Sequence, residues 1–353
     1  MTLTLLPGVV AHSVATARYT ANVLERPASG EPARTVVFVH GNVSSSHFYQ
    51  PTMLALPADV RALAVDLRGF GDSETLPVDA TRGLRDFSDD VLSVLDALGL
   101  DAVHLVGWSM GGGVVTQLLL DAPERVLSLT LEAPVSPYGF GGTHGPDGER
   151  NDADGAGTGG GGANPDFVAR LEAGDTSADE QTSPRTVFRT AYTAKPEAHA
   201  ELEDLWVASM LSTKTGVDNY PGDLAPSENW PGFAAGTKGV LNTMAPQHHN
   251  VAAIIDLLAK PPILWIHGDK DAIVSDGSFF DLNMLGQVGV VPGWPGADVA
   301  PPQPMKLQTR AVLDRYRANG GEYREVALPE AGHAPHLDEP DVFVAELVAH
   351  ISR

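Results

Sequence analysis

Three residues of this 353-residue chain have the types and the sequence surroundings of groups that cooperate in nucleophilic chemistry. Ser109 stands in the stretch GWSMG, between two apolar runs. A serine hydroxyl is a weak nucleophile at neutral pH, so it needs a base to take its proton and an acid to orient that base. Asp271 and His333 each follow soon after a later apolar run of strand length. We therefore predict that Ser109, His333 and Asp271 are nucleophile, base and acid.

The turn around Ser109 has the composition that such a nucleophile requires. A strand that ends at Gly107 and a helix that leaves at once would hold Ser109 in a strained backbone conformation, with its hydroxyl at the tip. The two limbs would approach so closely that side chains at Gly107 and Gly111 would collide with the opposite limb. The first N–H of the new helix, that of Met110, would face an anion formed beside the hydroxyl.

The surrounding segments predict an α/β fold with a mostly parallel central sheet flanked by helices. Four apolar runs of strand length occur in the first part of the chain, at 35–40, 61–66, 102–107 and 126–133. A helix is predicted between the second and third, because Leu84, Phe87, Val91, Leu95 and Leu98 recur at helical spacing before Gly99. Alternation of this kind gives right-handed crossovers and parallel strands.

The pattern is interrupted in the middle of the chain, which indicates an insertion. We predict a core formed by residues 1–135 and 251–353, with a mainly helical cap over residues 136–250. Strands at 263–267 and 323–328 would carry Asp271 and His333 to the carboxyl edge of the sheet, beside Ser109, where open α/β sheets bind ligands. A second insertion, the long loop 275–304, would lie over the same edge.

The Gly- and Asp-rich segment 139–163 is predicted to be a solvated, flexible loop on composition. An EF-hand loop here would need an acidic residue at Arg150 and a glutamate at Gly161, so that motif is excluded. The chain has no cysteine, which excludes disulfides, thiolate catalysis and thiolate metal sites.

Five motifs together resemble the α/β-hydrolase superfamily: VFVHGN (37–42), AVDLRGFGDS (64–73), VGWSMGGG (106–113), IHGDKDAIV (266–274) and AGHAPHLDEP (331–340). They span most of the expected core but not the cap. The resemblance implies an α/β-hydrolase fold with the order Ser, acid, His. It also implies that the residue after His-Gly, Asn42, donates the second oxyanion-hole N–H beside Met110. The acid would be Asp271, the last residue of GDKD, in preference to Asp269.

Other polar residues near these motifs have alternative interpretations. Glu132, after strand 126–131, occupies the position where a minority of relatives place the acid. We expect His104 to be a hydrogen-bonded core histidine and His336 to contact its own loop. For the pair His248 and His249, we favour a solvated position over one in the substrate pocket. By resemblance, a structural loop beside the oxyanion hole would hold Asp66, Arg68 and Asp72.

A serine nucleophile implies attack on a carbonyl carbon, since relatives that attack alkyl carbons use aspartate at this position. We predict a carboxylic ester hydrolase that forms an acyl-serine intermediate, for a small to medium, largely apolar substrate, with no metal and no cofactor. Lactonase, C–C bond hydrolase and cofactor-free perhydrolase activities remain open, as does a non-catalytic ligand-binding receptor of the same fold. The candidate pocket residues are Gly41, Trp108, Trp230, Phe233, Phe279 and Trp294.

Charge and hydropathy restrict the partners. The formal net charge is −22, which would repel nucleic acid and anionic membrane surfaces, so we expect neither as a partner. No run approaches the ~18 apolar residues of a membrane span. The stretch MTLTLLPGVVAHSV has no basic residue before its apolar part, unlike a secretory signal, and we expect a cytoplasmic location. A homo-oligomer stays open.

Overall fold

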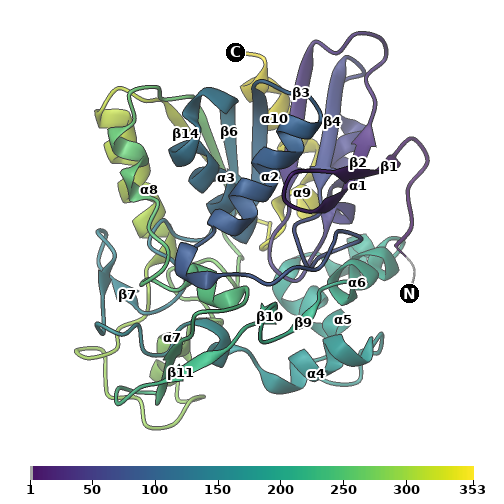
Figure 1. The fold of residues 1–353 in the computed structure, drawn as a ribbon. Coiled ribbons are helices and arrows are strands. Elements are labelled where there is room, and N and C mark those ends of the chain that lie inside the picture. The colour runs from purple at the N-terminus through teal and green to yellow at the C-terminus, as the bar shows by residue number, and fades with distance from the viewer. Residues whose placement is uncertain (1–2) are drawn as a thin grey trace.

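The computed structural model describes residues 3–353, and an eight-stranded sheet forms the centre of this part of the chain. The strand order is β1-β2-β4-β3-β5-β6-β13-β14 (Figure 1). The strands are β1 (Val10–Ala15), β2 (Thr20–Arg26), β3 (Arg34–Val39), β4 (Val60–Val65), β5 (Val103–Trp108), β6 (Val126–Glu132), β13 (Ile263–Gly268) and β14 (Tyr323–Leu328). The strands from β4 to β14 pair in parallel, as their long apolar runs predict.

The first two strands form a hairpin that the sequence analysis did not predict. β1 pairs antiparallel with β2, and β2 pairs antiparallel with β4. Five of the six β1 residues are exposed, so β1 is an edge strand without the buried apolar run that marks the central strands. Residues 1 and 2 of the predicted core lie outside the described residues.

Helices cover both faces of the sheet (Figure 1). On one face, α1 (Gln50–Ala55) contacts α10 (Pro340–Ile351), and on the other face α2 (Arg85–Ala97) contacts α3 (Met110–Asp121). The predicted stripe of α2 is buried at Phe87, Val91 and Leu95. Gly99 ends this helix with φ +66°, and Leu100 N donates back to Leu95 O at 2.9 Å. The remaining core helices are α8 (Met305–Ala318) and the short α9 (Pro335–Asp338).

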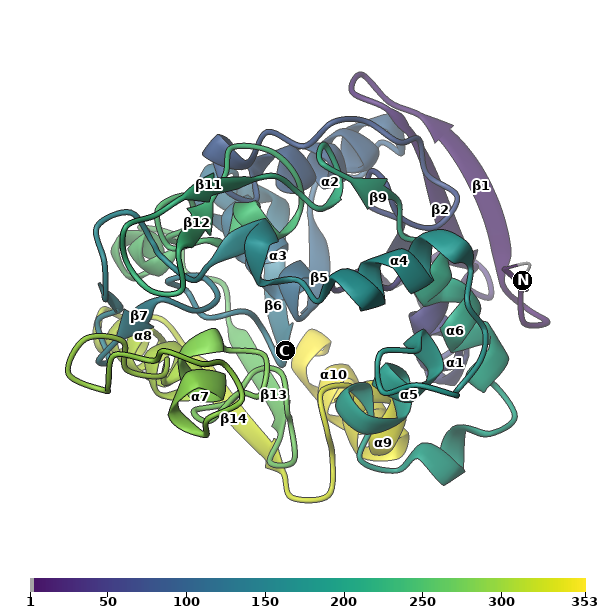
Figure 2. The ribbon, with the colours of Figure 1, turned by 90° about the horizontal axis from the view of Figure 1, so that it is seen from below.

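The segment between β6 and β13 is built of short elements. Its helices are η4 (Gly159–Gly162), α4 (Pro165–Ala173), α5 (Pro184–Val187), the π-helical turn η5 (Phe188–Tyr192), η6 (Pro196–His199), α6 (Glu203–Leu211), η7 (Leu241–Met244) and η8 (Ala252–Asp256). Its strands pair within the described chain as β7 (Thr143–His144) with β8 (Glu149–Arg150), β9 (Thr215–Gly216) with β10 (Tyr220–Pro221), and β11 (Leu224–Pro226) with β12 (Phe233–Ala235). With α7 (Leu282–Gln287) of the 275–304 loop, these elements surround the ends of β5, β6 and β13 (Figure 2).

Buried polar contacts join the Gly/Asp-rich segment to the 275–304 loop. Gln303 Nε2 donates to Gly139 O at 3.1 Å, and Gly141 N donates to Gln303 Oε1 at 2.5 Å. Gln308 of α8 donates to Thr143 Oγ1 at 3.1 Å. Because these side chains are buried and bonded, both segments have fixed positions against the core.

Candidate active site

Ser109 lies at the turn between β5 and α3 in a strained backbone conformation. Its φ is +56° and its ψ is −120°, outside the regions that a residue other than glycine readily adopts. The end of β6 holds the turn, because Ser109 N donates to Glu132 O at 2.9 Å and Val135 N donates to Ser109 O at 3.0 Å. The strain predicted from the GWSMG stretch is therefore present, and backbone hydrogen bonds maintain it.

The glycines at this turn are required by close contacts. A Cβ on Gly107 would lie 2.3 Å from Gly111 O, on the opposite limb of the turn, as the sequence analysis predicts. A Cβ on Gly111 would lie 2.2 Å from Val39 O, which belongs to the neighbouring strand β3 and not to the limb through Gly107. The reason for Gly111 is thus the packing of α3 against the end of β3.

Asp271 and His333 are hydrogen-bonded to each other. His333 Nδ1 lies 2.9 Å from Asp271 Oδ2 and 3.1 Å from Asp271 Oδ1, and both side chains are buried. Two backbone donors, Ile273 N at 2.8 Å and Val274 N at 2.9 Å, fix Asp271 Oδ1. The carboxylate therefore has one oxygen held by the backbone, and it orients the imidazole through Nδ1.

Ser109 and His333 line the same cavity. No hydrogen bond joins their side chains in the described structure, and free catalytic sites often tighten such contacts only when substrate binds. Trp108, the residue before the serine, holds the histidine loop, because its Nε1 donates to His333 O at 2.7 Å. The side chain of Asp269 is half exposed, and its Oδ1 lies 3.9 Å from His267 Nδ1. It therefore points away from Ser109, Asp271 and His333.

The two predicted oxyanion donors flank the serine. Met110 is the first residue of α3, and Asn42 lines the cavity. Neither backbone N–H donates to an acceptor within residues 3–353. The Asn42 side-chain oxygen Oδ1 is also buried without a partner there. Both N–H groups are thus free to bind an anion.

Glu132 pairs with His336 and not with His333. His336 donates to Glu132 Oε1 from its backbone N at 2.8 Å, and its Nδ1 lies 2.7 Å from the same oxygen. Tyr49 Oη donates to Glu132 Oε2 at 3.4 Å, and all three side chains are buried. His336 is therefore more than a contact of its own loop, and Glu132 makes no contact with the candidate base.

Two other histidines that the sequence analysis considered, His104 and His249, do not line the cavity at Ser109. His104 Nδ1 lies 2.8 Å from Ser128 Oγ, and burial lowers the pKa of His104 to about 4. The prediction of a solvated pair at His248 and His249 is wrong for His249. Its ring is buried, both ring nitrogens lack a partner among the described residues, and burial lowers its pKa to about 4.

The predicted structural loop beside the oxyanion segment is held by buried carboxylates. Asp66 accepts hydrogen bonds from Ser46 N at 2.7 Å and from Asp72 N at 3.0 Å. Arg68 forms a two-point ion pair with Asp90, at 2.6 Å and 2.7 Å. Burial opposes the charged form of Arg68, but the hydrogen bond and charge of Asp90 leave its pKa raised.

The cavity at Ser109 has a volume of about 460 Å³, within the usual range for small-molecule sites. Its wall is mostly apolar, with Val43, Val135, Phe140, Phe167, Val187, Leu241, Met244, Ile273, Phe279, Phe280, Leu282 and Leu285. The Gly/Asp-rich segment forms part of this wall at Gly141, Gly157–Gly159 and Gly162, so the prediction of a solvated loop is wrong for these residues, whereas residues 144–154 between them are exposed or partly exposed. Gly141, Gly157 and Gly159 adopt positive φ angles that let the chain fold closely over the cavity.

Of the six predicted pocket residues, Phe279 lines the cavity and the other five do not. Gly41 lies behind the serine, where a Cβ would be 2.9 Å from Ser109 Cβ. Trp108 is buried beneath the site. Three aromatic residues, Trp230, Phe233 and Trp294, pack among the insertions. Trp230 Nε1 donates to Pro292 O at 2.9 Å, and Trp294 Nε1 donates to Ala300 O at 2.9 Å.

One carboxylate that the sequence analysis missed also lines the cavity. Asp281 precedes α7 and accepts hydrogen bonds from Asn283 N at 3.0 Å and Gln303 N at 2.7 Å. Burial raises its pKa to about 6. No Lys or Arg side chain among the described residues lines this cavity. Asp281 directly before α7 resembles an ordinary N-cap residue, so nothing in the local sequence signals a cavity position.

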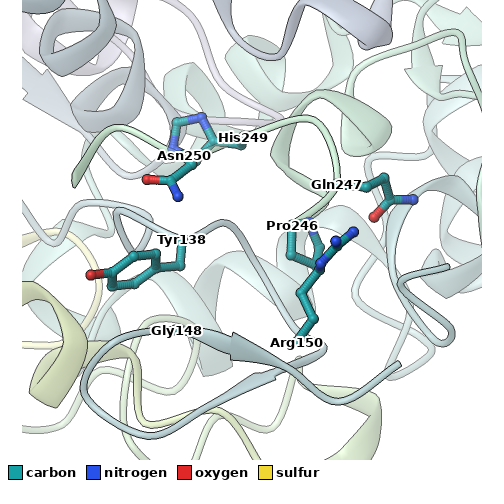
Figure 3. A pocket seen from close by; sticks show the side chains of 7 residues that line it. All are labelled: Tyr138, Gly148, Arg150, Pro246, Gln247, His249 and Asn250. Atoms are coloured by element: carbon teal, nitrogen blue, oxygen red, sulfur yellow. The ribbon is translucent and has the colours of Figure 1, made fainter. Parts of the chain in front are cut away.

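A second, smaller hollow of about 230 Å³ lies between the strands β7 and β8 and the segment after η7 (Figure 3). It is lined by Tyr138, Gly148, Arg150, Pro246, Gln247, His249 and Asn250. None of the predicted nucleophile, base, acid or oxyanion residues belongs to it. The larger cavity is therefore the candidate active site.

Residues 3–353 contain no group of three or more His, Asp or Glu side chains arranged to hold a metal ion. Within the same residues, none of the helices combines the length and the apolar character that crossing a membrane requires.

Comparison with known proteins identifies relatives of the first half of the core. A family model described as the alpha/beta hydrolase fold matches residues 34–156. Carboxylesterase YbfK of Bacillus subtilis is 34% identical over 112 residues, which cover 31% of this chain and 38% of that protein. The dihydrolipoyllysine-residue acetyltransferase component of the acetoin cleaving system of Cupriavidus necator is 41% identical over 112 residues, 32% of this chain and 29% of that protein. The matched stretch thus spans well under half of these relatives.

A solved structure extends the similarity of fold to the whole chain. The esterase EaEST from Exiguobacterium antarcticum superposes with a TM-score of 0.59 at 18% identity, covering 96% of this chain and 98% of that one. At this identity the likeness concerns the fold. The parallel sheet, the strained serine turn and the family match over residues 34–156 together show that the chain has the α/β-hydrolase fold.

Proposed function

We propose that this chain is a serine hydrolase that cleaves carboxylic esters. The observation that carries the proposal is the hydrogen bond between Asp271 and His333 at the wall of a cavity that Ser109 also lines. An acid that orients a histidine beside a strained serine is the arrangement that activates a hydroxyl for acyl transfer. The match to a carboxylesterase of Bacillus subtilis supports the same reaction class.

The reaction would proceed in two stages. His333 Nε2 takes the proton of Ser109 as Oγ attacks the carbonyl carbon, and the backbone N–H groups of Asn42 and Met110 bind the oxyanion. His333 then gives the proton to the leaving alcohol oxygen as the ester C–O bond breaks. Water attacks the acyl-serine by the same route and releases the carboxylic acid. Asp271 keeps the Nδ1 proton of the imidazole directed toward itself throughout.

The cavity wall favours an uncharged substrate of small to medium size. The apolar side chains of the wall would bind a hydrocarbon group of the substrate, and the cavity volume limits the length of that group. Without Lys or Arg among its described lining residues, and with Asp281 present, it offers nothing to neutralise a substrate carboxylate. We therefore propose neutral esters with short to medium acyl chains.

A fluorophosphonate probe followed by intact mass measurement tests the reaction class. The wild type should gain one adduct, and Ser109→Ala should gain none. A wild type without an adduct would contradict the proposal and favour a binding protein of the same fold.

A series of p-nitrophenyl esters from acetate to laurate tests the size limit, with Ser109→Ala as the blank. We expect kcat/KM to peak at a short or medium chain. A kcat/KM that rises steadily up to laurate would contradict a size limit set by a cavity of this volume.

A further inference from the structure

Tyr192 links three parts of the candidate active site from the segment above it. It ends the π-helical turn η5, where Thr193 N donates to Phe188 O at 3.3 Å. Such turns occur often at functional sites. The Tyr192 ring is 6% exposed and packs edge-on against Trp108, with centroids 5.6 Å apart, and against His333, at 6.1 Å. It therefore touches both the serine turn and the candidate base.

The hydroxyl of Tyr192 holds the loop that carries the predicted oxyanion donor. It lies 3.0 Å from Asn42 O and 3.1 Å from Val43 O, and it donates to these two carbonyls. No other donor within the described residues reaches either carbonyl. The two peptide groups that follow Asn42 are thus bonded by one side chain that comes from residues far away in the sequence. The peptide that carries the Asn42 N–H precedes them, and its carbonyl, Gly41 O, accepts a hydrogen bond from Ser44 Oγ at 2.8 Å.

This loop needs such support because its backbone is strained. Val43 has a φ of +48°, in the left-handed region that a β-branched residue rarely adopts. A strained conformation persists only where its surroundings hold it. The loss of the Tyr192 hydroxyl would leave the peptides after Asn42 free to relax. That relaxation would shift the Asn42 N–H relative to Ser109, although Gly41 O of the same peptide keeps its bond to Ser44 Oγ.

The backbone of Tyr192 is itself fixed to the histidine loop. Ala334 N donates to Tyr192 O at 2.9 Å. Asp338 joins the same two segments, accepting Ala194 N at 2.9 Å and Gly332 N at 2.6 Å. The residue that holds the oxyanion loop is therefore positioned by the loop that carries His333.

We propose that Tyr192 is a positioning residue that keeps the Asn42 N–H directed at the oxyanion, acting through its hydroxyl bonds to the Asn42 and Val43 carbonyls. The inference rests on the proposed function. It makes the oxyanion hole depend on a residue of the 136–250 segment, outside the core that supplies the serine, acid and histidine.

The test is Tyr192→Phe, which keeps the ring contacts and removes the hydroxyl. We expect kcat for p-nitrophenyl butyrate to fall about tenfold or more, with KM within about twofold, since the loss affects the transition state and not the bound ester. Affinity for a trifluoromethyl ketone, which forms the oxyanion, should fall by the same factor as kcat/KM.

Tyr316→Phe is the matched control. Tyr316 is buried and its hydroxyl donates to a backbone carbonyl, Pro261 O, at 2.6 Å, but it lies on α8 outside the cavity. Both variants should lose thermal stability, and only Tyr192→Phe should lose kcat. Unchanged kinetics in Tyr192→Phe, or an equal loss in Tyr316→Phe, would overturn the inference.

A second variant tests the role of strain by comparing the Tyr192→Phe background with the wild type. Glycine tolerates a φ of +48°, so Val43→Gly should lower kcat less in the Tyr192→Phe background than in the wild type. Equal losses in both backgrounds would count against the inference. Failure of the proposed function would look different, because the wild type itself would then form no fluorophosphonate adduct at Ser109.

Discussion

Replacing Asp271 by asparagine should disable the base without disturbing the fold. Oδ1 of Asp271 accepts two backbone N–H groups, from Ile273 and Val274, and only an oxygen can occupy that position. In the Asp271→Asn variant, the amide oxygen must therefore replace Oδ1, and the NH2 group must replace Oδ2, 2.9 Å from His333 Nδ1. Because two donors cannot face each other, Nδ1 loses its proton and Nε2 carries it.

A His333 protonated at Nε2 cannot accept the proton of Ser109. In serine proteases, the corresponding change lowers kcat about 10⁴-fold through the wrong tautomer. With the same geometry here, we expect kcat to fall by about 10³ to 10⁴, equal to roughly 4 to 5.5 kcal/mol of transition-state stabilisation. The melting temperature should change little, since both backbone hydrogen bonds to the side chain survive.

The assay is hydrolysis of p-nitrophenyl butyrate, with Ser109→Ala as the blank and Asp269→Asn as the matched control. Asp269 is half exposed and has no contact with His333, so its variant should keep wild-type kinetics. Glu132→Gln should cost stability through His336 and should reduce kcat far less than Asp271→Asn. Retention of more than about one tenth of the activity in Asp271→Asn, or a larger loss in Glu132→Gln, would refute the assignment of the acid.

Three further changes have defined outcomes. If the Asn42 amide binds substrate, Asn42→Ala should lower kcat/KM about tenfold for esters with a polar alcohol group and leave alkyl esters unaffected. Steady-state kinetics on both kinds of ester measure this effect. Kinetics equal to those of the wild type would exclude that role. Gly111→Ala should lower the melting temperature by more than about 10 °C, because its Cβ meets a backbone oxygen at 2.2 Å, whereas Gly277→Ala, whose Cβ would meet only Met284 Cε at 3.8 Å, should be neutral in the same thermal scan. Burial raises the pKa of Asp281 to about 6, so its protonated form favours folding below about pH 4 and that contribution is lost as pH rises through 6. Relative to Asp281→Asn, the wild type should lose about 2.4 kcal/mol of unfolding free energy between pH 4 and 7.5 in urea titrations, and parallel pH profiles would contradict this.

The central sheet was predictable because its strands are buried on both faces. Continuous apolar runs such as 35–40 and 102–107 have no other stable place in an α/β protein, and the observed strands β3 and β5 match them within about one residue. The hairpin β1–β2 was missed because β1 is an exposed edge strand, where the apolar signal is weak. The strands were thus predicted correctly where burial on both faces requires a continuous apolar run.

The walls of the cavity were much harder to predict. Large aromatic residues such as Trp230 and Trp294 were expected to line it, but each finds its hydrogen-bond partner within the insertions and packs there. Gly157, Gly159 and Gly162 line it instead, and the composition of their segment resembles that of a solvated loop. Residue type indicates what a side chain prefers to bury, but the shape of an insertion depends on long-range contacts that one sequence does not reveal.

The pairing of Glu132 with His336 shows a similar limit. The two residues are separated by 204 positions, and no local pattern joins them. The sequence showed Glu132 at a position that can hold a catalytic acid, but only the structure shows that its partner is His336.

The hydrogen bonds from the serine turn to the end of β6 set a boundary for protein engineering. Val135 N and Glu132 O both bond to the Ser109 backbone, so residues 132–135 act as part of the nucleophile's support although they precede the cap. A chimera that exchanges lids between relatives should join its segments after Val135. A junction two or three residues earlier would exchange the lid together with the residues that hold the Ser109 backbone.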